Sequence, residues 1–205
     1  MRMKKIGWIL LLVIAVCLSG CSGSPDDPDS QPDFIRECFL PYQSKEELLE
    51  KADAIVSVKI EKVGFKRMPD SMSLEPQPEE KEINTVSTAR VETVIKGDLA
   101  VGQKIRIFQN GDNKTRIYSG VRDGGGYLQK GQRKLLFLYA LSEEAAAVAR
   151  EKFGSIFGIH SLVGQYTLDD DDNIVEMTEE SRRLFGPIET LEDIRAAWET
   201  MKTQP

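Results

Sequence analysis

The chain has 205 residues, of which 40% are hydrophobic and 29% are charged, and it is long enough for one domain with a hydrophobic core. Its 33 acidic residues outnumber its 27 basic ones, and residues 1–20 hold three basic and no acidic residues, so residues 21–205 carry a formal net charge of −9. A chain this acidic lacks the basic surface that neutralises phosphate groups, so the composition excludes nucleic acid as an expected partner.

The first residues combine positive charge with a short apolar run. Arg2, Lys4 and Lys5 precede the stretch IGWILLLVIAVCL at positions 6–18. This run is shorter than the roughly 20 apolar residues that a helix needs to cross a bilayer. A basic start, an apolar run and small residues at its end are typical of an export signal.

The ending Leu18-Ser19-Gly20-Cys21 resembles the lipobox of bacterial lipoproteins, and residues 1–20 resemble their signal peptides. The resemblance implies that residues 1–20 are removed and that the Cys21 sulfur carries a diacylglycerol with fatty acyl chains such as palmitate. Two acyl chains hold a protein stably on a membrane. We therefore expect a lipid anchor on the extracytoplasmic face of the cell membrane, or in the outer membrane of a host with two membranes. An ordinary secretory peptide and an N-terminal membrane helix are the alternatives.

The stretch after Cys21 has the composition of a linker. Residues 22–33 read SGSPDDPDSQPD and show no apolar periodicity. Such a segment cannot bury a core, so it predicts a solvated tether. We expect the lipidated cysteine and tether to cover residues 21–42, and a single folded domain to cover residues 43–205.

Cysteine usage excludes an intrachain disulfide in the exported protein. Cys17 leaves with the signal peptide and Cys21 is acylated, so only Cys38 of the three cysteines remains. A small apolar side chain packed against its neighbours is the expected role of Cys38. A disulfide-linked dimer is the alternative.

The first half of the domain contains one helix signal and three alternating runs. In the stretch SKEELLEKA, Ser44 is followed three residues later by Glu47, which is a capping box. A loop is predicted over residues 66–81, which contain three prolines. Alternation of apolar and polar residues predicts strands with one polar face at 56–60, 85–95 and 104–107.

The second half is predicted from apolar runs and turn residues. Three glycines at 124–126 predict a corner that is flexible or has positive φ. The run KLLFLYAL at 134–141 predicts a central strand buried on both faces. Ser142 is a candidate cap for a short helix, and SLVGQYTL and IVEM flank the turn DDDDN as a hairpin. The stretch TLEDIRAAWETMK predicts a C-terminal amphipathic helix at about 190–202.

The order of three segments resembles netrin-like modules, which include the tissue inhibitors of metalloproteinases. The segments, within residues 51–140, are KADAIVSVKIEKVG, INTVSTARVETVIKGDLAVGQKIRIFQNG and YLQKGQRKLLFLY. The resemblance implies a mainly β fold with flanking helices (α+β): a five-stranded Greek-key barrel of the OB type, to which the C-terminal amphipathic helix is added. The inhibitor function does not follow, because those inhibitors chelate zinc through a free N-terminal cysteine, whereas Cys21 would be lipidated.

The acidic turn is a candidate calcium site. Asp169, Asp171 and Asn173 occupy the first three alternate ligand positions of an EF-hand loop, and Glu180 occupies the twelfth. Ile174 stands at the sixth position, where that loop needs glycine. The simpler interpretation is a solvated hairpin turn, which Asp and Asn favour by bonding their own backbone. We therefore expect no metal.

His160 is the only histidine of the chain, and Ser155 and Ser161 are close to it in sequence. A Ser-His-Asp triad is one hypothesis, but the chain has no Gly-x-Ser-x-Gly elbow. A structural histidine with satisfied hydrogen bonds is the expected role.

These features together predict a non-enzymatic binding module of the cell envelope. The barrel domain would bind a protein or another envelope component, with no cofactor beyond the acyl groups on Cys21. An exported hydrolase that uses His160 and a purely structural envelope protein are the alternatives.

Overall fold

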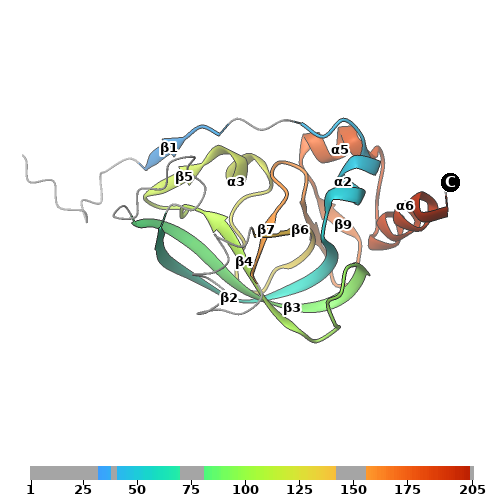
Figure 1. Cartoon of the computed structure of the whole chain (residues 1–205), viewed down its shortest axis with the longest axis horizontal. Coiled ribbons are helices and arrows are strands. Elements are labelled where there is room, and N and C mark those ends of the chain that lie inside the picture. The colour runs from blue at the N-terminus through green and yellow to red at the C-terminus, as the bar shows by residue number, and fades with distance from the viewer. Residues whose placement is uncertain (1–31, 38–40, 70–80, 142–155, 204–205) are drawn as a thin grey trace, which may run out of the picture. The chain divides into compact units, whose positions relative to one another are not determined.

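The computed structural model describes residues 32–37, 41–69, 81–141 and 156–203. In this part of the chain five strands close into a barrel, and helices and further strands surround it (Figure 1). The strands of the barrel are β2 (Ala54–Pro69), β3 (Lys81–Lys96), β4 (Lys104–Asn110), β6 (Arg133–Ala140) and β7 (Ile156–Ile159).

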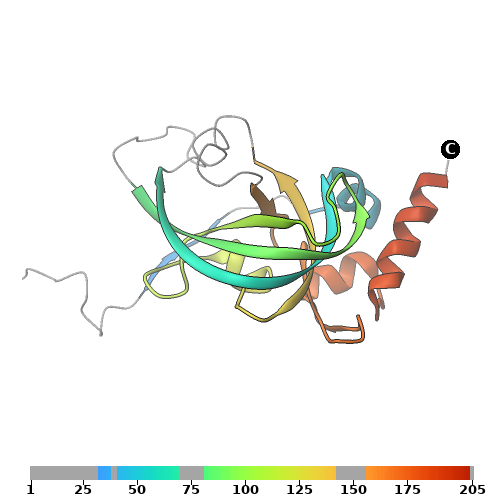
Figure 2. The ribbon, with the colours of Figure 1, turned by 90° about the horizontal axis from the view of Figure 1, so that it is seen from below.

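The pairing of these strands is that of an OB-like barrel. β2 pairs antiparallel with both β3 and β6, and Figure 2 shows β2 and β3 curving together as two long strands. β3 pairs antiparallel with β4, β4 pairs parallel with β7, and β7 pairs antiparallel with β6. The chain passes from β4 to β6 before it returns as β7 between them, which is a Greek-key path. This confirms the predicted mainly β fold with a five-stranded OB-like barrel.

β2 and β3 are longer than their alternating runs predict. β2 extends to Pro69 and β3 begins at Lys81, in register with Pro69. The predicted loop over 66–81 is therefore wrong at both of its ends. β2 pairs with β6 over residues 54–59, so at Pro69 its described partner is β3 alone, and a proline is tolerated at such an edge position. The rest of this loop and the helix predicted after Ser142 lie outside the described residues.

Two more strands continue the sheet beyond β6. β8 (Gln165–Leu168) pairs antiparallel with β6, and β9 (Ile174–Glu176) pairs antiparallel with β8. The turn DDDDN connects β8 and β9, which confirms the predicted hairpin.

β1 (Asp33–Ile35) lies within the segment 21–42 for which the sequence predicts a tether. It pairs parallel with β5 (Arg116–Tyr118), and the Asp33 amide donates to the Thr115 carbonyl over 2.8 Å. The side-chain pattern does not reveal this pairing, because it depends on backbone groups of a distant segment. Residues 33–35 are therefore part of the folded domain.

Side chains cap the start of α2 (Lys45–Lys51), α5 (Glu179–Phe185) and α6 (Leu191–Thr203), whereas α3 (Ser119–Asp123) has no side-chain cap. α2 is capped by Ser44, whose hydroxyl accepts from the Glu47 amide over 3.2 Å. The C-terminal helix α6 confirms the predicted amphipathic helix, with Leu191 and Ile194 buried.

The core has two layers that share β6. Leu136 and Leu138 belong to the cluster inside the barrel, with apolar residues of β2, β3 and β4. Leu135 and Phe137 belong to an outer cluster with residues of α2, β8, α5 and α6. The prediction of a central strand buried on both faces is confirmed. Because successive side chains of a strand alternate between faces, Lys134 lies on the inward face with Leu136.

Candidate functional site

Buried polar side chains gather at one end of the barrel. β4 and β7 are parallel and both end there, and β6, which is antiparallel to β7, begins there. We call this the α3 end, because α3 and the residues that follow it cover it. Its buried polar residues include Gln109, Lys134, His160 and Gln165.

Two glutamines hold the backbone that covers the α3 end. The Gln165 amide donates to the Gly125 carbonyl over 2.6 Å, and the Gln109 amide donates to the Gly126 carbonyl over 3.0 Å. Gly125 and Gly126 have φ of 104° and 80°, which confirms the predicted positive-φ corner at these two residues. At Gly125 a Cβ atom would lie 2.9 Å from the Gln165 amide nitrogen. Glycine therefore allows the backbone to approach the barrel closely.

A pocket of about 380 Å³ opens beside this corner. Its volume lies within the range of about 300–1,000 Å³ that is usual for small-molecule sites. We call it the Lys134 pocket. It is lined by Arg122, Asp123, Gly125, Gly126, Lys134, Gln165, Thr167, Glu176, Met177 and Thr178.

Lys134 is the buried charged group of this pocket, with only 3% of the residue exposed. Its ammonium donates to the Thr167 hydroxyl over 2.8 Å, and that hydroxyl donates to the Glu176 carboxylate over 2.9 Å. These side chains are neighbours across β6, β8 and β9. Burial lowers the pKa of Lys134 below its ordinary value, while the Glu176 carboxylate opposes this shift.

The ammonium keeps hydrogen-bonding capacity that the described residues do not use. A lysine ammonium has three N–H donors, and Thr167 is the one hydrogen-bond acceptor that the described part of the chain supplies. None of the ion pairs between described residues includes Lys134. The pocket therefore offers donors to a ligand that carries acceptors.

Lys134 is not among the site residues that the sequence predicts. In the sequence it is the first residue of the predicted apolar strand KLLFLYAL. The available signal was the period of two, which places a lysine on the same face as Leu136 and Leu138. A charged residue on an inward face is unusual and indicates a paired or functional group.

His160 follows β7 at the same end and is 9% exposed. Its Nδ1 lies 2.5 Å from the Tyr42 hydroxyl, and its ring is 5.3 Å from that of Tyr139. Burial lowers the pKa of His160 to about 4, although the Asp53 carboxylate raises it. The Nε2 atom makes no hydrogen bond of good geometry with a described residue.

The structure does not bring His160 together with a nucleophile and an acid. His160 and Ser161 both line a small cavity of about 40 Å³. In the described residues, however, neither a serine hydroxyl nor a carboxylate is hydrogen-bonded to the imidazole. Ser155 lies outside the described residues. A cavity of this size has room for a few water molecules, since each needs roughly 10–15 Å³.

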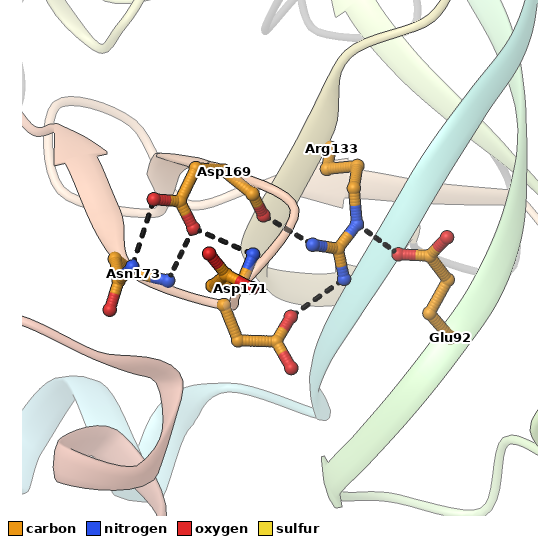
Figure 3. A network of polar contacts seen from close by, with 6 residues as sticks. Glu92, Arg133, Asp169, Asp171 and Asn173 are labelled. Carbon is orange, nitrogen blue, oxygen red and sulfur yellow. Dashed lines mark hydrogen bonds and ion pairs between the residues drawn. The ribbon is translucent and has the colours of Figure 1, made fainter.

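The acidic turn is organised by its own side chains (Figure 3). The Asp169 carboxylate accepts from the backbone amides of Asp171 and Asn173 over 2.9 Å each. It also accepts from the Asn173 side chain over 2.9 Å. These bonds lower the pKa of Asp169 and fix a hairpin turn.

Arg133 joins this turn to the barrel (Figure 3). Its guanidinium pairs with Asp172 at 2.6 Å and with Glu92 at 2.8 Å, and it also donates to the Asp169 carbonyl. The positive charge of Arg133 therefore lies beside the turn and contributes to the lowered pKa of Asp169. The spacing of residues within the turn does not predict this contact with Arg133.

Glu180, the fourth candidate calcium ligand, lies on α5. It lines a separate depression together with Tyr42 and Ser161. The structure thus brings Asp169, Asp171 and Asn173 together in the turn and places Glu180 elsewhere. In residues 32–37, 41–69, 81–141 and 156–203, no three His, Cys, Asp or Glu side chains form a group that could hold a metal ion.

Cys21 and Cys38 lie outside the described residues, so their predicted roles stay predictions. No helix in the described part of the chain has the length and apolar character needed to span a bilayer. No known family model matches the chain, and no curated protein matches it.

Proposed function

We propose that the chain is a lipid-anchored protein on the extracytoplasmic side of the cell membrane, whose barrel domain binds a component of the cell envelope at its α3 end. The observation that carries the binding role is the Lys134 pocket, where a buried ammonium faces a cavity of ligand size. The anchor rests on the basic, apolar and small residues that lead to Cys21.

A role without catalysis is supported by the environment of His160. A general base needs a nucleophile within hydrogen-bond reach and a pKa near the working pH. His160 instead contacts Tyr42 through Nδ1, and burial lowers its pKa to about 4. The buried groups of the α3 end are better arranged to hold a ligand than to transfer a proton.

The anchor is tested by replacing its sulfur. In a Cys21→Ala variant expressed in a bacterial host, we expect no incorporation of labelled palmitate and retention of residues 1–20, because the acceptor thiol is missing. A Cys38→Ala variant is the matched control and should be acylated and processed like the native chain. Mass spectrometry measures both. An unmodified Cys21 thiol in the natively expressed chain would contradict the proposed anchor.

The binding role is tested by crosslinking in intact cells. Asp123 lines the Lys134 pocket and has an exposed side chain, so a photoreactive amino acid at this position should form an adduct with the bound component. The same amino acid at Val101, which is 70% exposed in the turn between β3 and β4 at the opposite end of the barrel, is the control. Adducts that are absent, or equal at the two positions, would count against binding at the α3 end.

A further inference from the structure

We propose that the Lys134 pocket binds a small molecule through a single carboxylate group, which contacts the Lys134 ammonium at the floor of the pocket. This inference rests on the proposed binding function and names the chemical class of the ligand. It is drawn from the hydrogen-bond donors of Lys134, from the charges at the rim, and from the fact that no ion pair between described residues includes Lys134.

The floor of the pocket is built to present a donor. The backbone of Lys134 is part of β6, and its ammonium donates to the Thr167 hydroxyl on the neighbouring strand β8. These two attachments hold the ammonium in place. Because the Thr167 hydrogen is directed to Glu176, the Thr167 oxygen can only accept from Lys134. The remaining N–H groups of Lys134 are then available to the two oxygens of a carboxylate. Such charge-assisted hydrogen bonds are stronger than neutral ones.

The rim of the pocket selects against a second negative charge on the ligand. Asp123 and Glu176 line the pocket and are both exposed at its edge. Arg122 also lies at the edge, but it pairs with Asp123 at 2.7 Å and stacks on the Phe34 ring at 4.4 Å. A dianion such as phosphate would therefore be repelled at the rim by Glu176, whereas a monocarboxylate meets less repulsion.

A purely structural role does not explain the ammonium. Removing a charge from water is costly unless it is paired, and among the described residues Lys134 donates directly to the neutral Thr167 hydroxyl, while the Glu176 carboxylate reaches it only through that hydroxyl. A methionine is similar in length and would fill this inward position without that cost. A ligand carboxylate supplies a direct ion pair, whereas the Glu176 carboxylate acts on Lys134 through the Thr167 hydroxyl.

The test uses the full chain in non-ionic detergent and isothermal titration with sodium acetate, propionate and lactate as probes. Propanamide, the neutral analogue of propionate, and inorganic phosphate are titrated for comparison. We expect at least one carboxylate to bind, with propanamide and phosphate binding at least tenfold more weakly. Lys134→Met should reduce the carboxylate affinity at least tenfold. Lys130→Met, which removes an exposed lysine from the neighbouring turn, should leave it unchanged.

A second measurement keeps the test decisive if Lys134→Met does not fold. In the native chain, the pKa of the Lys134 ammonium, followed by nitrogen NMR, should rise when the carboxylate is added. A carboxylate affinity that Lys134→Met leaves unchanged, or a Lys134 pKa that does not respond, would overturn the inference. Preferred binding of phosphate or propanamide would overturn the carboxylate assignment and leave the binding function intact. Absence of any binding, together with no crosslink from position 123, would overturn both.

Discussion

Lowering the pH from 7 to 4 is expected to reduce the free energy of unfolding of the native chain by about 3 kcal/mol more than that of a His160→Gln variant. The reason is the low pKa of His160 in the folded state, which is about 4 compared with an ordinary value of 6.5. Above pH 6.5, neither the folded nor the unfolded state binds the proton, and the histidine does not affect stability.

Between pH 6.5 and 4 the unfolded state binds the proton and the folded state does not, so unfolding becomes more favourable as the pH falls. Below pH 4 both states are protonated and the loss reaches a plateau. Burial between Tyr42 and Tyr139 is the main cause, and the nearby Lys51 and Lys96 act in the same direction. The Asp53 carboxylate acts in the opposite direction and only reduces the shift.

Urea denaturation at a series of pH values measures this effect. Glutamine keeps a polar side chain near Tyr42 but does not titrate, so the comparison isolates the histidine. Asp112, Asp169 and Asp193 also have lowered pKa values, and their protonation near the acid limit destabilises both proteins alike. Parallel pH profiles for the two proteins would show that the imidazole is not protected from protonation in the folded state.

The barrel could be predicted from the sequence where local patterns decide the structure. The period-two runs at 56–60, 85–95 and 104–107 fall within β2, β3 and β4, because one face of each strand packs inside the barrel. The cap Ser44 is recognisable because a capping box depends on residues three positions apart.

The Lys134 pocket could not be predicted, because it depends on contacts between distant segments. Lys134 meets Thr167 only when β8 pairs with β6, and the corner at Gly125 covers the barrel only when Gln165 reaches it. The pairing of β1 with β5 has the same origin, since the two strands are far apart in the sequence and join through backbone groups. The segment 33–35, Asp-Phe-Ile, is too short for an alternating pattern to predict a strand.

The acidic turn shows how a local pattern can suggest two structures. The spacing of Asp169, Asp171 and Asn173 fits both a calcium loop and a turn that bonds its own backbone. The hydrogen bonds of the Asp169 carboxylate and the guanidinium of Arg133 belong to the second structure. The deciding contact with Arg133 comes from β6, which the spacing within the turn does not include.

Replacing Phe137 with alanine is expected to reduce the free energy of unfolding by about 4 kcal/mol, which is typical of a large side chain removed from a core. Phe137 is 0% exposed and belongs to the outer cluster. Its ring lies 5.7 Å from the rings of both Tyr166 and Phe185, so the variant loses two aromatic contacts as well as buried area. These contacts join β6 of the barrel to β8 and α5.

Two control variants show whether the loss comes from the outer layer itself. Leu136→Ala changes the preceding residue, which lies on the inner face of β6. It should reduce the free energy of unfolding by about 2–5 kcal/mol, because it leaves a cavity in the inner cluster. Val175→Ala, at a residue that is 61% exposed, should change the stability by less than about 0.5 kcal/mol. A loss below about 1 kcal/mol for Phe137→Ala, with a large loss for Leu136→Ala, would mean that the helices do not pack on β6, because a buried ring cannot be removed from a formed core at so small a cost.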